Sequence, residues 1–104
     1  MSKYSLITLW ERAYPNKNEA YDYAGRKMLK AAIGDQRSKY CPSIDHIRPL
    51  TKGGKDVLGN ISICNQATNF QKAESFQSWT ANGKHFKAKR VKGTSDSYKI
   101  YQID

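Results

Sequence analysis

The segment from residue 43 to residue 69 combines side chains that can take up a proton with side chains that can bind a cation. It reads "SIDHIRPLTKGGKDVLGNISICNQATN" and contains Asp45, His46, Asn60 and Asn69. A histidine can remove a proton from water near neutral pH, whereas a carboxylate or an amide oxygen suits a hard cation such as Mg²⁺. Taken alone, an Asp-His pair is more often an exposed polar dipeptide. The sequence around the pair is therefore needed to distinguish a surface loop from an active site.

Asp45 and His46 are expected on a short extended run that Pro49 stops. Adjacent side chains on a strand point to opposite faces, so the carboxylate and the imidazole need different roles. Residues 52–55 predict a loop, because two of them are glycines, which adopt backbone angles that other residues resist. The alternating run 61–63 predicts a second short strand.

From residue 66 to residue 79 the pattern becomes helical. Asn69, Ala73 and Phe76 recur at i, i+4 and i+7, which places Asn69 on a packing face of this helix. A polar amide on such a face needs a partner. The order strand, loop, strand, helix would bring Asn69 close to the Asp-His pair.

This run resembles the core motif of the HNH endonucleases, also called the ββα-metal or His-Me finger family. Members typically read Asp-His-Ile, Pro, Gly-Gly, Asn-hydrophobic and then Asn-x-x-Lys. In this sequence the elements are Asp45-His46-Ile47, Pro49, Gly53-Gly54, Asn60-Ile61 and Asn69-x-x-Lys72. Outside residues 45–72, "DYAGRKMLKAAIGD" and "ANGKHFKAKRV" are similar to the flanks of small single-domain HNH proteins of bacteria and their phages. The resemblance implies an α+β fold with a ββα-metal finger core, an N-terminal helical or mixed segment and a C-terminal basic β-hairpin.

The resemblance also implies a role for each matched polar residue. His46 would be the general base that deprotonates the water attacking a phosphodiester. Asp45 and Asn69 would hold one divalent cation, which stabilises the leaving 3′ oxygen. Asn60 would clamp the loop between the strands through backbone hydrogen bonds and so keep His46 oriented. Asn65 is a rival to Asn69 if the helix begins later.

The implied metal is Mg²⁺ or Mn²⁺, with one ion per active site. Many HNH proteins carry two Cys-x-x-Cys pairs that bind structural zinc, but this chain has only Cys41 and Cys64, so no structural zinc is expected. The third signature position is Asn69 rather than His, which makes an H-N-N variant, and an amide is a poor ligand for soft metals. We expect both cysteines to be small buried residues.

The charge of the chain predicts a polyanionic partner. Eighteen Lys and Arg against nine Asp and Glu give a net charge of +9, which favours a polyanion, most often nucleic acid. With the HNH resemblance, double-stranded DNA is the expected partner. Residues 84–92 include five Lys or Arg, and His85 among them is expected to be a DNA-facing or surface residue rather than a catalyst. The candidate nucleic-acid contacts are Arg48, Lys52, Lys72, Lys84, Lys87, Lys89 and Arg90. Arg48 and Lys72 could instead only cover the loop and helix surface.

The length allows one domain, residues 1–104, with a core motif at 43–79, an N-terminal extension at 1–42 and a basic hairpin at 80–104. No stretch reads as a signal peptide or as a membrane span, so an intracellular, cytoplasmic setting is expected.

The segments that flank the core motif are less clear. Residues 3–14 could form a short helix or a strand. Residues 18–34 carry apolar residues at helical spacing and favour a helix, although Gly25 also fits a turn that leads into a strand. Asn82-Gly83 predicts a hairpin between residues 76–80 and 84–91, and residues 98–103 read as a last strand.

These observations predict a metal-dependent DNA endonuclease of the HNH type that hydrolyses phosphodiester bonds. Because each chain has one site, a monomer should nick one strand. An alternative keeps the fold without the chemistry, as a nucleic-acid-binding module that assists a larger phage or repair machine. A third possibility is an interaction protein whose charge serves only solubility.

Overall fold

The computed structural model describes residues 2–104, which form an α+β structure with two α-helices and three small antiparallel sheets. The helices and strands are, in chain order, α1 (Leu6–Ala13), β1 (Glu19–Tyr21), β2 (Lys27–Leu29), β3 (Pro42–His46), β4 (Ile61–Asn65), α2 (Gln66–Lys72), β5 (Trp79–Ala81), β6 (Lys84–Arg90) and β7 (Tyr98–Gln102). Short 3₁₀ helices lie at Lys30–Ala32, Leu50–Lys52 and Leu58–Asn60. No helix within residues 2–104 is both long and apolar enough to cross a membrane.

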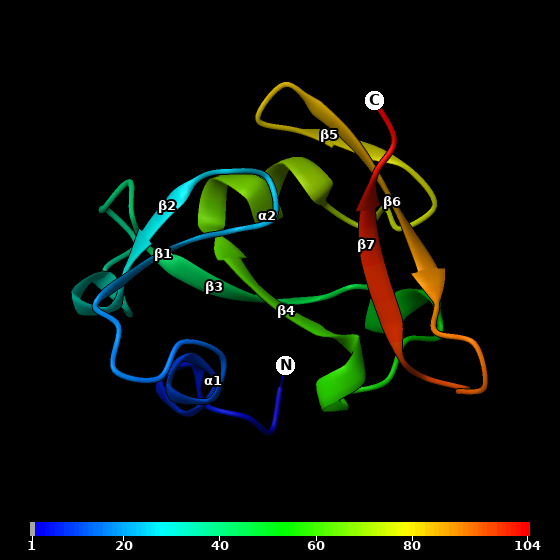
Figure 1. Cartoon of the computed structure of the whole chain (residues 1–104), viewed down its shortest axis with the longest axis horizontal. Coiled ribbons are helices and arrows are strands. Elements are labelled where there is room, and N and C mark those ends of the chain that lie inside the picture. The colour runs from blue at the N-terminus through cyan, green and yellow to red at the C-terminus, as the bar shows by residue number, and fades with distance from the viewer. Residues whose placement is uncertain (1) are drawn as a thin grey trace.

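The β3–β4 hairpin runs through the middle of the molecule, with α1 against one side and α2 against the other (Figure 1). The C-terminal sheet has the strand order β5-β6-β7 and contacts α2 through β5. The site motif thus lies in the central layer, between the N-terminal helix and the C-terminal sheet.

The N-terminal segment is a helix rather than a strand. Helix α1 begins after Ser5, whose Oγ accepts a hydrogen bond from the backbone N–H of Thr8 at 3.2 Å. Such a cap satisfies one of the backbone donors that a helix leaves free at its start. Leu9 and Trp10 are the buried residues of α1 and face the hairpin.

The prediction of a helix at residues 18–34 is wrong, and the alternative, a turn at Gly25 that leads into a strand, is confirmed. This segment forms the β1–β2 hairpin, in which Glu19 pairs with Leu29. The carboxylate of Asp22 accepts the backbone N–H groups of Ala24 and Arg26, each at 2.9 Å, and Gly25 has a φ of +87°. A short acidic side chain that bonds to its own turn competes with the helix, and a glycine at positive φ completes the turn.

The β3–β4 hairpin confirms the two predicted strands. Asp45 pairs with Ser62, and His46 pairs with Ile61 where β3 ends, next to the connecting loop. Helix α2 follows β4 directly because Asn65 caps it, accepting the N–H of Ala67 at 2.8 Å.

Helix α2 is shorter than the predicted 66–79. It ends at Lys72 because Ala73 adopts a φ of +50°, in the left-handed region. The expectation that Asn69, Ala73 and Phe76 share one helix face is therefore wrong. The ring of Phe76 packs outside the helix, 6.5 Å from the ring of Tyr98 at centroid distance.

The C-terminal sheet contains the predicted hairpin. Asn82 and Gly83 both have positive φ values, of 52° and 76°, as a two-residue hairpin turn requires. The predicted last strand is β7, which pairs with β6. The inner face of this sheet carries Trp79 and Phe86, which pack on Tyr23 with ring centroids 6.1 and 4.9 Å away.

The loop between β3 and β4 requires its two glycines for different reasons. Gly53 has a φ of +90°, whereas Gly54 passes so close to the chain that an added Cβ would lie 1.8 Å from the carbonyl oxygen of Arg48. The N–H of Gly54 donates to the carbonyl of Pro49 at 2.9 Å, which closes the turn. The conformation of this loop therefore depends on Gly54 having no side chain.

We expect Gly54→Ala to lower the free energy of unfolding by about 1–3 kcal/mol, the usual cost of forcing an extra carbon into a packed site. Urea denaturation followed by circular dichroism measures this. Gly34→Ala is the matched control, because Gly34 has a φ of +87° and open space around it, so only backbone strain is introduced. A Gly54→Ala variant as stable as the wild type would contradict the close approach.

Candidate active site

The predicted residues Asp45, His46 and Asn69 line one pocket. The pocket lies where β3 ends and has a volume of about 330 Å³. Its walls are Asp45, His46, Pro49, Leu50, Thr51, Asn69, Ala73 and Glu74. Strand β3, the 3₁₀ turn after it and helix α2 each contribute to this wall, so the order strand, loop, strand, helix does bring the three residues together.

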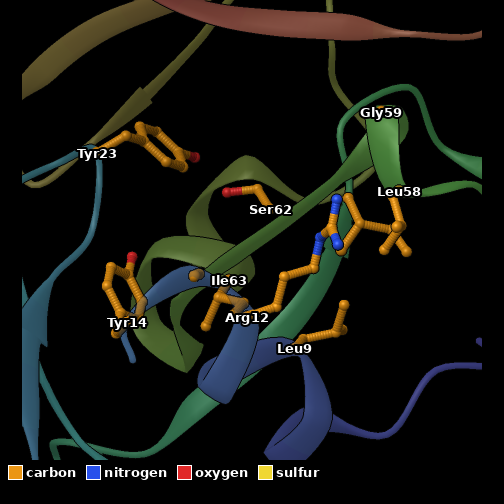
Figure 2. A pocket seen from close by; sticks show the side chains of 10 residues that line it. Leu9, Arg12, Tyr14, Tyr23, Leu58, Gly59, Ser62 and Ile63 are labelled. Carbon is orange, nitrogen blue, oxygen red and sulfur yellow. The ribbon is translucent and has the colours of Figure 1, made fainter. Parts of the chain in front are cut away.

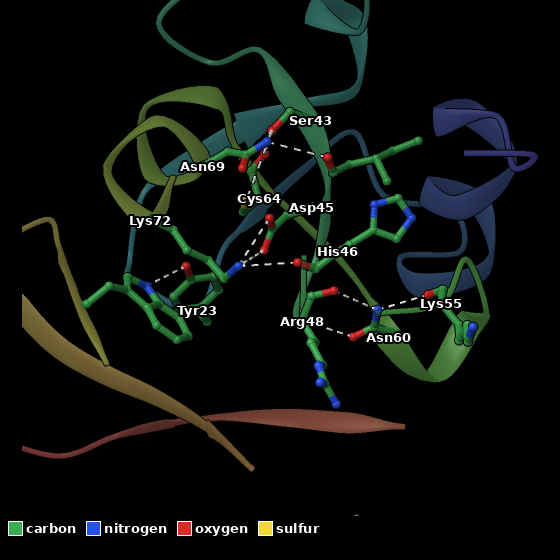
Figure 3. A network of polar contacts seen from close by, with 12 residues as sticks. Tyr23, Ser43, Asp45, His46, Arg48, Lys55, Asn60, Cys64, Asn69 and Lys72 are labelled. Atoms are coloured by element: carbon green, nitrogen blue, oxygen red, sulfur yellow. Dashed lines mark hydrogen bonds and ion pairs between the residues drawn. The ribbon is translucent and has the colours of Figure 1, made fainter. Parts of the chain in front are cut away.

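Asp45 is buried and pairs with Lys72, which is fully buried on α2 (Figure 3). Lys72 Nζ lies 3.4 Å from Asp45 Oδ1, with hydrogen-bond geometry, and 3.3 Å from Oδ2, without it. Nζ also donates to the carbonyl of His46 at 3.2 Å and lies 5.2 Å from the ring centroid of Trp79. Burial raises the pKa of Asp45 from 3.8 to about 6, and the opposing effect of Lys72 is smaller.

His46 contacts an acid that the motif did not indicate. Its Nε2 lies 2.8 Å from Oδ1 of Asp56, in the loop between β3 and β4. Asp56 is held in turn by the N-terminal segment, because Ser2 Oγ donates to Oδ1 and the backbone N–H of Lys3 donates to Oδ2, both at 2.7 Å. These hydrogen bonds, with that of Lys3 foremost, hold the pKa of Asp56 well below its usual range.

Asn60 makes the backbone hydrogen bonds expected of a loop clamp. It is fully buried, its Oδ1 accepts the N–H of Arg48 at 2.9 Å, and its Nδ2 donates to the carbonyls of Arg48 and Lys55 at 3.0 and 2.9 Å (Figure 3). The backbone N–H of Ile47 donates to the carbonyl of Asn60 at 2.8 Å. One amide thus ties both ends of the loop to the chain beside His46.

Asn69, not Asn65, is the amide at the pocket. Nδ2 of Asn69 points to the Ser43 hydroxyl at 3.2 Å and the Ile44 carbonyl at 3.4 Å, so its oxygen is the atom left to face another ligand. The rival Asn65 is buried and caps α2, and its Nδ2 donates to the carbonyls of Lys27 and Lys39. The side chain of Asn65 is therefore used for structure.

Glu74 is a second acid at the pocket that the motif did not indicate. It follows the end of α2, lines the pocket with Asp45 and accepts a hydrogen bond from the hydroxyl of Thr51. Its charge contributes to the raised pKa of Asp45. Sequence reasoning missed Glu74 because it assumed that the helix continued past Lys72.

Three of the expected nucleic-acid contacts, Arg48, Lys72 and Lys84, are engaged within the protein. Lys72 has no exposed surface, so the prediction that it contacts phosphate does not fit the structure. Arg48 donates from Nη1 to the Tyr98 hydroxyl at 2.9 Å and from Nε to the Lys52 carbonyl at 2.7 Å, and its guanidinium lies 5.4 Å from the Phe76 ring centroid. Arg48 therefore braces the loop against the C-terminal sheet.

The other basic candidates are distributed over two surfaces. Lys52 is exposed in the loop after β3. Lys84 is half-buried and donates to the carbonyl of Ala24 at 3.2 Å, which makes it a structural contact. Side chains on a strand alternate between its two faces, and Phe86 faces the core, so Lys87 and Lys89 point to the outer face of the C-terminal sheet. Arg90 is on the same face as Phe86 but is exposed because it lies at the end of the strand.

The outer face of the C-terminal sheet is basic across two strands. Lys87 pairs with Tyr101, and Lys89 pairs with Lys99, which the motif did not indicate. His85 also lies on this face, is exposed and is 3.9 Å from the Asp104 carboxylate. Its position fits the prediction of a surface residue.

A larger pocket, of about 510 Å³, lies between α1 and β4 (Figure 2). It is lined by Leu9, Arg12, Ala13, Tyr14, Tyr23, Leu58, Gly59, Ile61, Ser62 and Ile63. Figure 2 shows the Arg12 side chain extended toward Leu58. None of these residues is an acid or a histidine, whereas Asp45, His46 and Glu74 line the smaller pocket.

Comparison of the chain with protein-family models, with curated proteins and with solved structures found no match. The function of the pocket therefore has to be inferred from its own residues.

We expect Lys72→Met to lower the free energy of unfolding by about 3–5 kcal/mol at pH 7, because it leaves the buried Asp45 carboxylate without a counter-charge. Since the folded-state pKa of Asp45 lies above its unfolded value, the folded protein keeps a proton there between pH 3.8 and about 6 that the unfolded chain releases. The contribution of this carboxyl to stability thus falls as the pH rises through that window, and without Lys72 the fall continues to higher pH. Denaturation curves at pH 4 and pH 7 measure the difference.

Two comparisons make this test specific. Asp45→Asn/Lys72→Met should regain most of the loss, because no charge then remains buried. Lys55→Met, at an exposed position, should change stability by less than about 0.5 kcal/mol. An equal loss for Lys72→Met at both pH values would show that lost packing, rather than an unpaired carboxylate, explains its effect.

Proposed function

We propose that this chain is a metal-dependent DNA endonuclease of the HNH type, in which β3, β4 and α2 form a ββα-metal finger. One observation carries the proposal: Asp45, His46 and Asn69, matched by spacing to the family motif, line the same pocket. The clamp of Asn60 on the intervening loop supports it, because the hydrogen bonds are those that the motif implies.

His46 would act as the general base. It would take a proton from a water molecule, the water oxygen would bond to phosphorus, and the bond from phosphorus to the 3′ oxygen would break. The leaving 3′ oxygen would take a proton from solvent, and His46 would later release its own. One site cuts one strand, so nicked DNA is the expected first product.

The donor atoms at the pocket suit Mg²⁺ or Mn²⁺. Asp45 is buried with one oxygen, Oδ2, that has no hydrogen-bond partner, and Asn69 faces the same pocket. Over residues 2–104, no three His, Cys, Asp or Glu side chains lie close enough to form a closed metal site. Mg²⁺ needs only one or two carboxylates, since it keeps water and phosphate oxygens as ligands. Asp45 and Asn69 would hold the ion, which when bound neutralises the phosphate and stabilises the leaving oxygen.

Double-stranded DNA is the proposed substrate because the surface is strongly basic. The net charge, the exposed Lys52 and Lys89 and the half-buried Lys87 would supply contacts to the phosphate backbone. Such contacts carry no sequence information, so this part of the proposal concerns affinity and not site choice.

The Asp45–Lys72 pair favours a second candidate, a nucleic-acid-binding module without catalysis. An ammonium group 3.3 Å from the carboxylate already neutralises Asp45 and competes with a metal ion for it. In this case the chain would bind DNA in a salt-sensitive manner and cleave none with Mg²⁺ or Mn²⁺.

Incubation with supercoiled plasmid separates the two candidates. We expect the wild type with Mg²⁺ to convert supercoiled DNA to open circles, with linear DNA appearing later, and EDTA to prevent this. His46→Ala should reduce the nicking rate by about 100-fold or more, the typical contribution of a general base. Agarose gel electrophoresis over a time course measures the rate.

The chain provides its own control for the loss of an imidazole. His85 is the only other histidine in the sequence and is not among the residues that line the pocket, so His85→Ala should retain metal-dependent nicking. If the wild type binds plasmid but does not nick it with either metal, the endonuclease proposal fails and the binding module is favoured. Equal nicking by wild type and His46→Ala would remove His46 from the mechanism.

A further inference from the structure

The contact between His46 and Asp56 has a chemical consequence for the imidazole. A carboxylate can only accept hydrogen bonds, so the 2.8 Å contact requires a hydrogen on Nε2 of His46. A neutral imidazole that carries its hydrogen on Nε2 has its lone pair on Nδ1, which is then the atom able to take a proton. The carboxylate also stabilises the imidazolium that forms when the proton arrives.

Asp56 is itself fixed by residues far away in the sequence. Oδ1 accepts from the hydroxyl of Ser2 as well as from His46, and Oδ2 accepts from the backbone N–H of Lys3. The hydroxyl of Ser2 also accepts the N–H of Tyr4 at 3.1 Å, which turns the N-terminal segment toward the loop. Three donors from two parts of the chain thus determine where this carboxylate lies.

We propose that Asp56 is the positioning residue for His46, and that Ser2 and Lys3 place Asp56 for that role. Asp56 would hold the Nε2–H tautomer and the ring orientation, so that Nδ1 is the basic atom. The catalytic consequence rests on the proposed endonuclease function, whereas the tautomer of His46 does not. The two can therefore fail separately.

The tautomer can be measured on the free protein. With only two histidines in the chain, a two-bond ¹⁵N–¹H correlation spectrum of labelled protein resolves each ring, and His85→Gln assigns the signals. We expect neutral His46 to carry its hydrogen on Nε2 in the wild type and to become a mixture of tautomers in Asp56→Ala. If wild-type His46 carries the hydrogen on Nδ1, the proposal is overturned without any variant.

Kinetics tests the catalytic consequence. Asp56→Asn and Asp56→Ala should lower kcat for plasmid nicking on the order of 10–100-fold, the effect typical of removing the hydrogen-bond partner of a metal-ligating histidine, and leave KM for DNA unchanged. Asp96→Asn is the matched control, because it makes the same change in charge at a bend near the surface, where the Asp96 carboxylate accepts a hydrogen bond from the hydroxyl of its neighbour Ser95. If the rise in net charge explained the effect, Asp96→Asn would reproduce it.

The role proposed for Ser2 and Lys3 can be tested with two different substitutions of Lys3, one of which is the control. Lys3→Pro removes the backbone N–H that holds Asp56, whereas Lys3→Ala keeps it. We expect Lys3→Pro, combined with Ser2→Ala, to shift the His46 tautomer and lower kcat in the same direction as Asp56→Asn, and Lys3→Ala to do neither. Equal spectra for the Lys3→Pro/Ser2→Ala and Lys3→Ala variants would overturn the role of the N-terminal segment.

The outcomes distinguish the two proposals. A wild type that shows the Nε2–H tautomer but never nicks DNA leaves the positioning of His46 standing and removes the endonuclease function. A wild type that nicks DNA, with tautomer and kcat unchanged in folded Asp56→Asn, removes Asp56 as positioning residue. Should Asp56→Ala fail to fold, the wild-type spectrum and the spectrum of the Lys3→Pro/Ser2→Ala variant still test whether Asp56 sets the tautomer of His46.

Discussion

The buried ion pair between Asp45 and Lys72 is the interaction on which the site geometry depends. It joins the end of β3 to the last turn of α2 in a place where both side chains have left water. Taking two charges out of water is costly, so the arrangement persists only while each retains the other and its hydrogen bonds. The same pair fixes the distance between strand and helix and determines how much negative charge Asp45 can offer to a ligand.

Short polar side chains link distant segments of the backbone by hydrogen bonds, as a disulfide or a structural zinc does in other small proteins. Asp22 accepts the backbone N–H of Asn65 as well as those of its own turn, and Asn65 reaches back to two carbonyls before α2. Asn60 does the same for the loop after β3. These side chains bond to backbone groups that would otherwise be buried without partners, which explains why they are themselves buried.

The parts of the structure that follow from local chemistry were predictable from sequence. The strands around Asp45 and Ile63 and the turn at Asn82 and Gly83 belong to this class. The gathering of Asp45, His46 and Asn69 at one pocket was expected instead from the order strand, loop, strand, helix. Residues 18–34 were predicted incorrectly because helical spacing was given more weight than the turn chemistry of Asp22 and Gly25. Asp56 was missed because its contacts with the N-terminal segment depend on the tertiary fold, and Glu74 was missed because the helix was expected to continue past Lys72.

The hydrogen bonds from Ser2 and Lys3 to Asp56 also bear on the order in which the chain folds. They join residues 54 and 53 positions apart, so the intervening chain must be closed into a loop before they form. Contacts of such sequence separation are slow to form compared with those within a hairpin. We expect the β3–β4 hairpin to be in place before the N-terminal segment docks on it. The residues synthesised long before Asp56 would then be among the last to reach their native positions.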